Sequence, residues 1–342
     1  MEQEHYTVGI ICALPHEAAA AIAMLDEEAG HMVEQDPNDH NSYRLGRLHH
    51  HNVVIASLPA GIVGTSSAAV VAKDMLRTFK ALRFGLVVGI GGAAPIPDSE
   101  DQDIRLGDVV IGKPTGTNGG LIQLDYGKMT QSEGLIRKGS LPAPPFSLLT
   151  ALARLETARE LGECTIPLHL SNMFKKRPGM RKRFGNPGTE NDVLYHPKYV
   201  HPASAATCVP CDISKQISRQ ERELLEPRVF CGTIGSSNVV IKDAILRDRL
   251  REELGVMCFE MEAAGLINFP CLVIRGISDY SDSHKNDRWQ RYAAAVAAAC
   301  AKSILGYIAP VSVQREQPIV HVSGSSFPTN SSNRENRPRS EH

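Results

Sequence analysis

The amino-acid sequence predicts an α/β fold, with a central mixed, largely parallel, twisted sheet flanked by helices. Short apolar runs rich in Val and Ile recur along the chain, and segments with helical spacing or composition lie between them. Runs that are apolar at every position are typical of strands buried on both faces of a sheet. The runs are Thr7–Cys12, Val53–Ser57, Leu86–Ile90, Asp108–Ile111, Phe230–Ile234 and Cys271–Ile277, and the helical segments are Ala18–Glu28, Ser66–Phe79, Lys242–Leu254, Glu262–Asn268 and Asp287–Tyr307.

Composition narrows the function classes. The chain has 342 residues, of which 42% are hydrophobic, enough to bury a large core. Its 37 Lys and Arg balance 38 Asp and Glu, so no global charge draws it to nucleic acid or to a membrane surface. The start of the chain has no leader pattern, and the eight cysteines suit reduced thiols in a large core. We therefore expect a cytoplasmic protein in which any bound anion is held by a local site.

Two regions depart from the strand–helix alternation. A polar stretch at about residues 164–228 carries a basic cluster and lacks periodicity, which indicates an insertion into the core fold. Residues 317–342 are dominated by Ser, Asn, Pro, Arg and Glu, which favours a disordered tail or linker over residues 311–342. We expect one catalytic domain over residues 1–310, the insertion included.

The glycines Gly89, Gly91 and Gly92 follow a buried strand but complete no dinucleotide-binding fingerprint. Without a Cβ, they either let backbone amides approach a ligand or form a tight turn, and the sequence leaves both open.

A single Cys-x-x-Cys, Cys208 and Cys211, has His196 and His201 upstream. Four ligands are the number that zinc requires, but the irregular histidine spacing is equally compatible with packed thiols. We assign no metal and no cofactor from the sequence.

Acidic residues stand where the ligand of an α/β sheet is expected, just beyond strand ends. Glu17 follows the first strand, Glu260 and Glu262 enter a helical segment, and Asp279 ends the run RGISD. Helix capping would explain each one alone. Together, carboxylates can serve as general acid, general base and hydroxyl clamp, the set that cleaves a glycosidic bond.

These residues carry a family resemblance. GIICALPHE, GIGG followed by IRLGDVVI, FEMEA and RGISD, in this order, resemble the nucleoside phosphorylase and nucleosidase superfamily over about residues 6–308. LDYGK, CFEMEAAGL and DSHKNDRWQRYAA are most similar to the nucleoside-phosphorylase-like domain at the N-terminus of fungal NLR-type immune receptors. The resemblance implies a nucleoside phosphorylase-like fold and a homo-oligomer.

The resemblance also implies roles for individual residues. Glu17 would activate the attacking water, Glu262 would bind the ribose hydroxyls, and Asp279 would protonate or hydrogen-bond purine N7. The remaining implied binding residues are Met261 under the ribose, Glu260 beside it, Arg275 as the orienter of Asp279, Gly89, Gly91 and Gly92 at the strand end, and Asn238, Val240 and Ile241 near the base.

Departures from the phosphorylase pattern indicate a hydrolase. Val87 and Ile90 occupy the places where phosphorylases of this superfamily carry an Arg and a Ser or Thr that hold phosphate. Losing a charged bidentate donor removes a major part of an anion site, so water is the expected nucleophile. A phosphorylase would need ligands from elsewhere, such as Arg44, Arg47 or another subunit, and an inactive nucleotide-sensing module is the alternative of another class.

The substrate is expected to be a purine nucleotide. Lys128 and Lys285 add cations in the motifs of the narrower group, although lysines are usually solvated. Thr65 and Ser66 open a helix, and helix N-termini bind phosphate. We expect ATP or dATP to be hydrolysed to adenine and (deoxy)ribose 5-triphosphate, a reaction that fits an immune effector, with a plain purine nucleosidase as the alternative.

Overall fold

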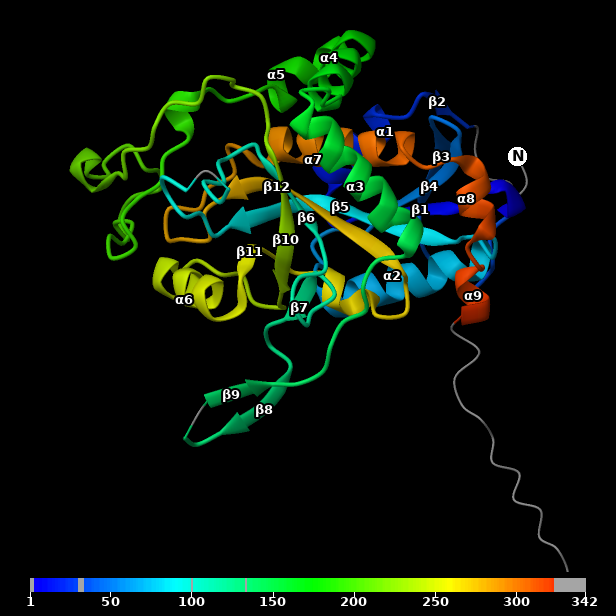
Figure 1. Ribbon diagram of the computed structural model, residues 1–342, viewed down its shortest axis with the longest axis horizontal. Coiled ribbons are helices and arrows are strands. Elements are labelled where there is room, and N and C mark those ends of the chain that lie inside the picture. Colours follow the sequence, from blue (N-terminus) through cyan, green and yellow to red (C-terminus); the bar gives the residue numbers. More distant parts are fainter. Residues whose placement is uncertain (1–2, 30–33, 100, 133, 323–342) are drawn as a thin grey trace, which may run out of the picture.

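The computed structural model of the protein describes residues 3–29, 34–99, 101–132 and 134–322. It is a mixed α/β fold in which helices flank a central sheet (Figure 1). The strands of that sheet are β1 (Val8–Cys12), β2 (Glu27–Glu28), β3 (Tyr43–Leu48), β4 (His51–Ser57), β5 (Phe84–Ala93), β6 (Val109–Gly112), β7 (Leu121–Gln123), β10 (Val229–Ser236), β11 (Val256–Glu260) and β12 (Cys271–Asp279). A separate hairpin pairs β8 (Gly127–Thr130) with β9 (Gly134–Arg137).

The helices connect these strands. The α-helices are α1 (Pro15–Ala23), α2 (Thr65–Thr78), α3 (Phe146–Glu160), α4 (Ile166–Lys176), α5 (Arg181–Phe184), α6 (Ala244–Leu254), α7 (Gln290–Gly306), α8 (Pro310–Arg315) and α9 (Ile319–Val322). The 3₁₀ turns are η1 (Gln3–His5), η2 (Pro178–Met180), η3 (Thr189–Asn191), η4 (Ile213–Lys215) and η5 (Ala263–Leu266). Among the described residues, no helix has the length and apolar character needed to span a bilayer.

The sheet partly closes on itself around β5. The strand order is β11-β10-β6-β12-β5-β1-β4-β3-β2, and β11 also pairs with the end of β5. The strands β4, β1, β5 and β12 are parallel, whereas β6 runs antiparallel to β12. Parallel strands end at the same edge, so the carboxyl ends of β1, β5 and β12 meet there, and β11 arrives from the opposite direction.

Helix α7 anchors one face of the sheet. It contacts β5 and β12 and packs against α1, α3 and α4, while α2 contacts β1 and β4 from the other face (Figure 1). The run from Ala293 to Ala301 is buried, and a Cβ on Gly276 of β12 would lie 1.9 Å from the carbonyl oxygen of Ala293. Small side chains on the helix and a glycine on the strand therefore allow a close approach.

The predicted elements are confirmed at all six apolar runs, each of which overlaps a strand. Two helical predictions were wrong in part. The segment predicted as Ala18–Glu28 begins at Pro15 and ends at Ala23, and its last residues form edge strand β2. The segment Glu262–Asn268 contains the 3₁₀ turn η5 rather than an α-helix, because Glu260 caps its backbone amides in a tight turn.

Both regions that depart from the alternation contribute to the core. Within the predicted insertion, Ile166, Leu170 and Met173 of α4 are buried in the cluster that contains α7. The predicted tail was wrong for its first part: Val313 of α8 and Ile319 of α9 are buried, and the amide of Ile319 donates to the carbonyl of Leu82 at 2.9 Å. The rest of that prediction, residues 323–342, lies outside the described residues.

The burial of Ile319 predicts that Ile319→Ala destabilises the fold. Truncating a buried isoleucine costs about 2–5 kcal/mol, because the lost methyl groups leave a cavity. Val311→Ala is the matched control, since Val311 is 52% exposed. Urea melts should show a lower midpoint for Ile319→Ala alone, and equal midpoints for both variants would contradict the packing of α9.

Candidate active site

The ends of three strands meet at the glycines of β5. Gly89 pairs with Arg275 of β12, and Gly92 pairs both with Asp279 of β12 and with Phe259 of β11. A Cβ on Gly89 would lie 2.2 Å from Nη1 of Arg275, and one on Gly92 would lie 2.5 Å from Oδ1 of Asp279. Any side chain at these two positions would displace the groups around them. The absence of side chains at Gly89 and Gly92 therefore lets Arg275 and Asp279 of the neighbouring strand lie close to β5.

Glu17 is fixed by backbone amides. Oε2 accepts hydrogen bonds from the amides of Ala13 and Leu14 at 2.7 and 2.8 Å, and Oε1 accepts from the amide of Ile90 at 2.8 Å. The side chain is 1% exposed. Burial raises the pKa of this carboxyl, although the Arg275 guanidinium and the three amides lower it. The carboxylate is thus held in one orientation at the junction of β1, α1 and β5.

Arg275 ties two acidic residues of the FEMEA segment to the sheet. Its Nη2 donates to Oε2 of Glu260 and lies 3.4 Å from Oε2 of Glu262. Glu260 also accepts from the amides of Glu262 and Ala263, so its carboxylate is fully engaged within the protein. From the resemblance, Arg275 was expected to orient Asp279, and Glu260 was expected to bind substrate. The contacts of both residues instead position Glu262.

Glu262 titrates near neutrality. Burial raises the pKa of its carboxyl to about 7, Arg275 lowers it, and Glu260 and Glu17 raise it further. The amide of Gly64, at the start of α2, lies 3.4 Å from Oε1 of Glu262. A carboxyl that can both accept and donate suits the binding of vicinal hydroxyl groups.

Asp279 has a different set of partners. Its Oδ2 accepts from the Ser278 hydroxyl at 2.9 Å and from the Lys285 ammonium, and its Oδ1 accepts from the amide of Ser281 at 3.0 Å. Asp279 is 4% exposed and the Lys285 side chain is 24% exposed. The residue is therefore an oriented carboxylate paired with a cation that reaches solvent.

A cavity of about 420 Å³ opens beside this carboxylate. Asp279, Ser278 and Lys285 line it on the sheet side, and Tyr195 and Cys208 of the insertion line it on the other. Of the three sequence-predicted catalytic residues, Asp279 lines this cavity, and Glu17 and Glu262 do not.

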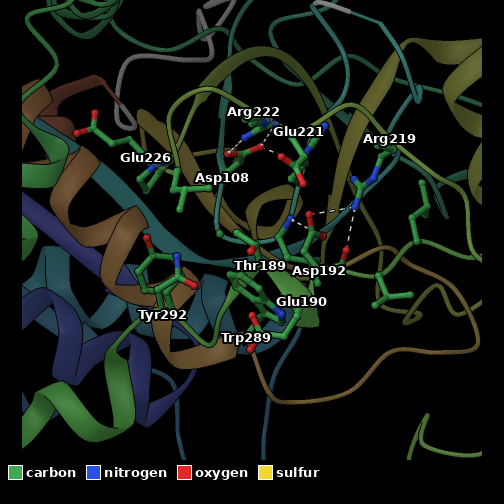
Figure 2. A pocket seen from close by; sticks show the side chains of 18 of the residues that line it. Asp108, Thr189, Glu190, Asp192, Arg219, Glu221, Arg222, Glu226, Trp289 and Tyr292 are labelled. Atoms are coloured by element: carbon green, nitrogen blue, oxygen red, sulfur yellow. Dashed lines mark hydrogen bonds and ion pairs between the residues drawn. The ribbon is translucent and has the colours of Figure 1, made fainter.

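A larger cavity of about 600 Å³ adjoins the first and shares Leu106, Glu190, Val193 and Gln216 with it. Figure 2 shows arginines and carboxylates of this larger cavity paired with each other. Arg222 bonds Asp108 at 2.8 Å, Arg219 bonds Asp192 at 3.0 Å, and Arg105 bonds Asp103 at 2.6 Å. The charges on these three arginines are therefore already neutralised by protein carboxylates.

Residues expected to hold base and phosphate lie at the start of α2 and beyond β10. The amide and the hydroxyl of Thr65 both bond Oδ1 of Asn238 at 3.0 Å, so Asn238 occupies the helix end that a phosphate was expected to take. Ser66 is exposed, Met261 and Ile241 are half-buried, and Val240 is exposed. Lys128 is exposed on the β8–β9 hairpin, which extends away from the sheet (Figure 1). The structure does not bring Lys128 together with Lys285.

Sequence reasoning missed Ser278 and His284. Ser278 precedes Asp279 within RGISD, and its hydroxyl bond to the neighbouring carboxylate leaves no pattern in a sequence. His284 lies in DSHKN, the motif that supplied Lys285, and is 6% exposed between Tyr195 and Tyr199. Its burial depends on the insertion, which the sequence did not place.

Comparisons with known proteins identify relatives of this chain. The chain is 47% identical over 321 residues to a nucleotide-binding leucine-rich repeat (NLR)-like protein of Hyaloscypha variabilis, covering 94% of this chain and 31% of that protein. It therefore spans about a third of the length of that relative. It is 25% identical over 309 residues to the 5′-methylthioadenosine/S-adenosylhomocysteine nucleosidase of Mycobacterium bovis, covering 87% and 95% of the two chains.

A shorter match and a solved structure extend the comparison. Over 77 residues, 20% of this chain and 15% of the relative, the sequence is 38% identical to the ATP nucleosidase Cap17 of Escherichia coli. A methylthioadenosine/S-adenosylhomocysteine nucleosidase structure from Helicobacter pylori superimposes with a TM-score of 0.55 at 17% identity, covering 88% of this chain and 98% of that one. This likeness confirms the predicted fold class.

The family model described as the phosphorylase superfamily matches residues 7–309, almost all of the described chain. That range contains the strand ends, the glycines of β5 and each of the carboxylates discussed above, and it confirms the family resemblance seen in the sequence. The chain belongs to the phosphorylase superfamily.

Proposed function

We propose that this protein hydrolyses the N-glycosidic bond of a purine nucleotide, with ATP or dATP as substrate and adenine and (deoxy)ribose 5-triphosphate as products. The residues around Glu17 support hydrolysis by water over cleavage by phosphate. Ile90, where a phosphorylase would carry a hydroxyl for phosphate, gives its backbone amide to Glu17 instead. Val87 is an apolar side chain that is 2% exposed. Glu17 is therefore the candidate base, and the two side chains that would hold phosphate are apolar.

The proposed reaction divides between two groups of residues. Water forms a bond to C1′ and gives a proton to Glu17, while the C1′–N9 bond breaks and its electron pair passes to the purine. A proton from the Asp279–Lys285 pair reaches N7, which makes the base a neutral leaving group. Glu262, positioned by Arg275 and by the Gly64 amide, binds the ribose hydroxyls. Stabilising the developing positive charge on the sugar is the remaining task of the carboxylates.

Two observations support a purine nucleotide as substrate: the similarity to known nucleosidases and the position of Lys285. An E. coli relative is an ATP nucleosidase, and a relative that matches 94% of this chain is an NLR-like protein. This context supports an immune effector role. Lys285 borders the cavity beside Asp279. The similarity to a methylthioadenosine nucleosidase supports a plain purine nucleosidase as the second candidate.

A product assay tests the nucleophile and the substrate. In phosphate-free buffer the protein should release adenine from ATP with a kcat/KM higher than that for AMP, adenosine or methylthioadenosine. Chromatography of the products should show ribose 5-triphosphate and no 1-phosphorylated sugar when phosphate is added.

Each alternative has its own outcome in that assay. Base release that depends on added phosphate would identify a phosphorylase. A preference for methylthioadenosine or adenosine over ATP would overturn the nucleotide assignment and leave a purine nucleosidase. Binding of nucleotide without any turnover would identify the inactive sensing module.

Asp279→Asn should lose activity by about a hundredfold to ten-thousandfold, because an amide cannot deliver a proton to N7. Single-turnover rates with saturating substrate isolate the chemical step. Asp101→Asn is the control: it removes a carboxylate at an exposed position that does not line the cavity. A loss of less than about tenfold for Asp279→Asn would remove this residue from the role of acid.

The raised pKa of Glu262 predicts a pH-dependent stability. Between pH 4.5, the ordinary value, and about 7, the folded protein holds a proton that the unfolded chain has released. The free energy of unfolding should therefore fall as pH rises through this window, by at most about 1.4 kcal/mol per pH unit from this one group.

Glu262→Gln should flatten that fall, because the amide does not titrate. Glu252→Gln is the control, since the Glu252 side chain is 72% exposed. Urea melts at pH 5, 6, 7 and 8 measure the slopes, and parallel slopes for wild type and Glu262→Gln would contradict the proposed protonation of Glu262.

A further inference from the structure

The insertion carries a cluster of three metal-ligand side chains. The cluster consists of one ligand atom from each of His201, Cys208 and Cys211, and these three atoms lie within 4.8 Å of one another. The two cysteines belong to a tight turn in which the amide of Cys211 donates to the carbonyl of Cys208 at 3.1 Å. Ligand atoms around a tetrahedral zinc lie about 3.3–3.8 Å apart, given metal–ligand bonds of about 2.0–2.3 Å. The cluster is thus close to the size of one coordination sphere.

The buried ring of His284 lies beside this cluster. Its nitrogens are outside the group of atoms within 4.8 Å of one another, so the ring would have to turn toward a bound ion to supply a fourth ligand. The His284 ring meets the His201 ring edge to face, with centroids 5.4 Å apart, and the Cys208 thiol lies 3.7 Å from the His284 carbonyl. The His284 side chain is 5% exposed, yet within the described residues neither ring nitrogen has a hydrogen-bond partner. The nearest carboxylate oxygen, of Asp282, is 3.9 Å from Nδ1. Buried imidazole nitrogens without partners are costly unless something binds them.

We propose that His201, Cys208, Cys211 and His284 bind one Zn²⁺ ion. Two thiolates and two imidazoles form a ligand set that zinc prefers, and four protein ligands make a closed, structural site rather than a catalytic one. On binding, each thiol releases its proton to solvent, the two neutral imidazoles coordinate through a ring nitrogen, and the waters of the hydrated ion leave. No electron transfer is involved.

The ion would join the insertion to the loop that follows β12. Protein contacts already connect them: the amide of His201 donates to the Ser283 hydroxyl at 2.9 Å, and Tyr195 stacks on His284 with centroids 4.0 Å apart. Cys208 and His284 line the same 420 Å³ cavity as Asp279 and Lys285. Zinc would therefore hold one wall of that cavity in place. The inference concerns metal content and does not depend on the proposed reaction.

The competing account is a pair of packed thiols that bind no metal. It predicts reduced cysteines, or a Cys208–Cys211 disulfide after oxidation, and no stoichiometric metal. All eight cysteines are free in the structure. The two accounts differ in what the purified full chain contains and in how it responds to Co²⁺, whose absorption reports its ligands.

The test begins with the full chain, purified under reducing conditions. After ZnCl₂ is added and excess ion removed, elemental analysis should find about one Zn²⁺ per chain, with about two protons released per ion at a pH where free thiols are protonated. Co²⁺ in place of Zn²⁺ should show thiolate charge-transfer bands and strong tetrahedral d–d absorption. Less than about a tenth of an equivalent of zinc, with all thiols still reduced, would overturn the proposal.

Variants assign the ligands. Cys208→Ser and His201→Gln should weaken Zn²⁺ binding, measured by competition with a chromophoric chelator. Changing a residue that only hydrogen-bonds a metal ligand costs about 10–100-fold in metal affinity, and the loss for these two variants should be larger. Cys164→Ser and His196→Gln are the controls, a cysteine outside the cluster and an exposed histidine of the same insertion.

His284→Gln tests the fourth position separately. A weakened affinity and a loss of tetrahedral Co²⁺ absorption would support four protein ligands. An unchanged spectrum and affinity would overturn the assignment of His284. Circular dichroism of each metal-free variant identifies any that fails to fold, and for those the wild-type stoichiometry and Co²⁺ spectrum still decide the proposal.

Discussion

The buried guanidinium of Arg275 is the interaction on which the candidate site depends. It is 1% exposed and lies among the carboxyl groups of Glu17, Glu260 and Glu262. A buried ion pair contributes little net stability, but removing one partner leaves an uncompensated charge that costs about 3–5 kcal/mol. Here three acidic residues from α1, β11 and the turn after it share one cation from β12. Arg275 therefore positions Glu260 and Glu262, whereas Glu17 is held by three backbone amides and is affected by the charge of Arg275.

This sharing also explains why the carboxyls differ. Glu260 has its oxygens occupied by Arg275 and by two amides, and Glu17 by three amides, so both are fixed. Glu262 has a distant amide and a longer contact to Arg275, and burial moves its pKa to about 7. Asp279, on the same strand as Arg275, has a separate cation in Lys285. One strand thus supplies two electrostatically distinct halves of a site.

The insertion supplies the second wall of the cavity beside Asp279. The sheet ends present Asp279 and Lys285, and the segment that carries Tyr195 and Cys208 covers them from the other side. Figure 1 shows this segment as long loops beside the ends of the strands. Loops of this length form few regular backbone hydrogen bonds of their own, so side-chain contacts have to fix their position. Stacking of Tyr195 and Tyr199 on His284 is one such anchor, and the proposed zinc would be another.

The sequence by itself determined the fold class, the positions of six buried strands and the strand-end carboxylates Glu17, Glu262 and Asp279, but it missed the buried strand β11. Continuous apolar runs and acidic residues directly after them are local signals, readable along the chain. Only the tertiary structure decided the partners. Arg275 bonds Glu260 and lies near Glu262, and the cation that pairs with Asp279 is Lys285. Lys128 lies apart on the β8–β9 hairpin. Val313 and Ile319 are buried in a segment whose composition indicated disorder. These outcomes depend on which strands pair and which segments cover them, and such contacts join residues far apart in sequence that no local pattern relates.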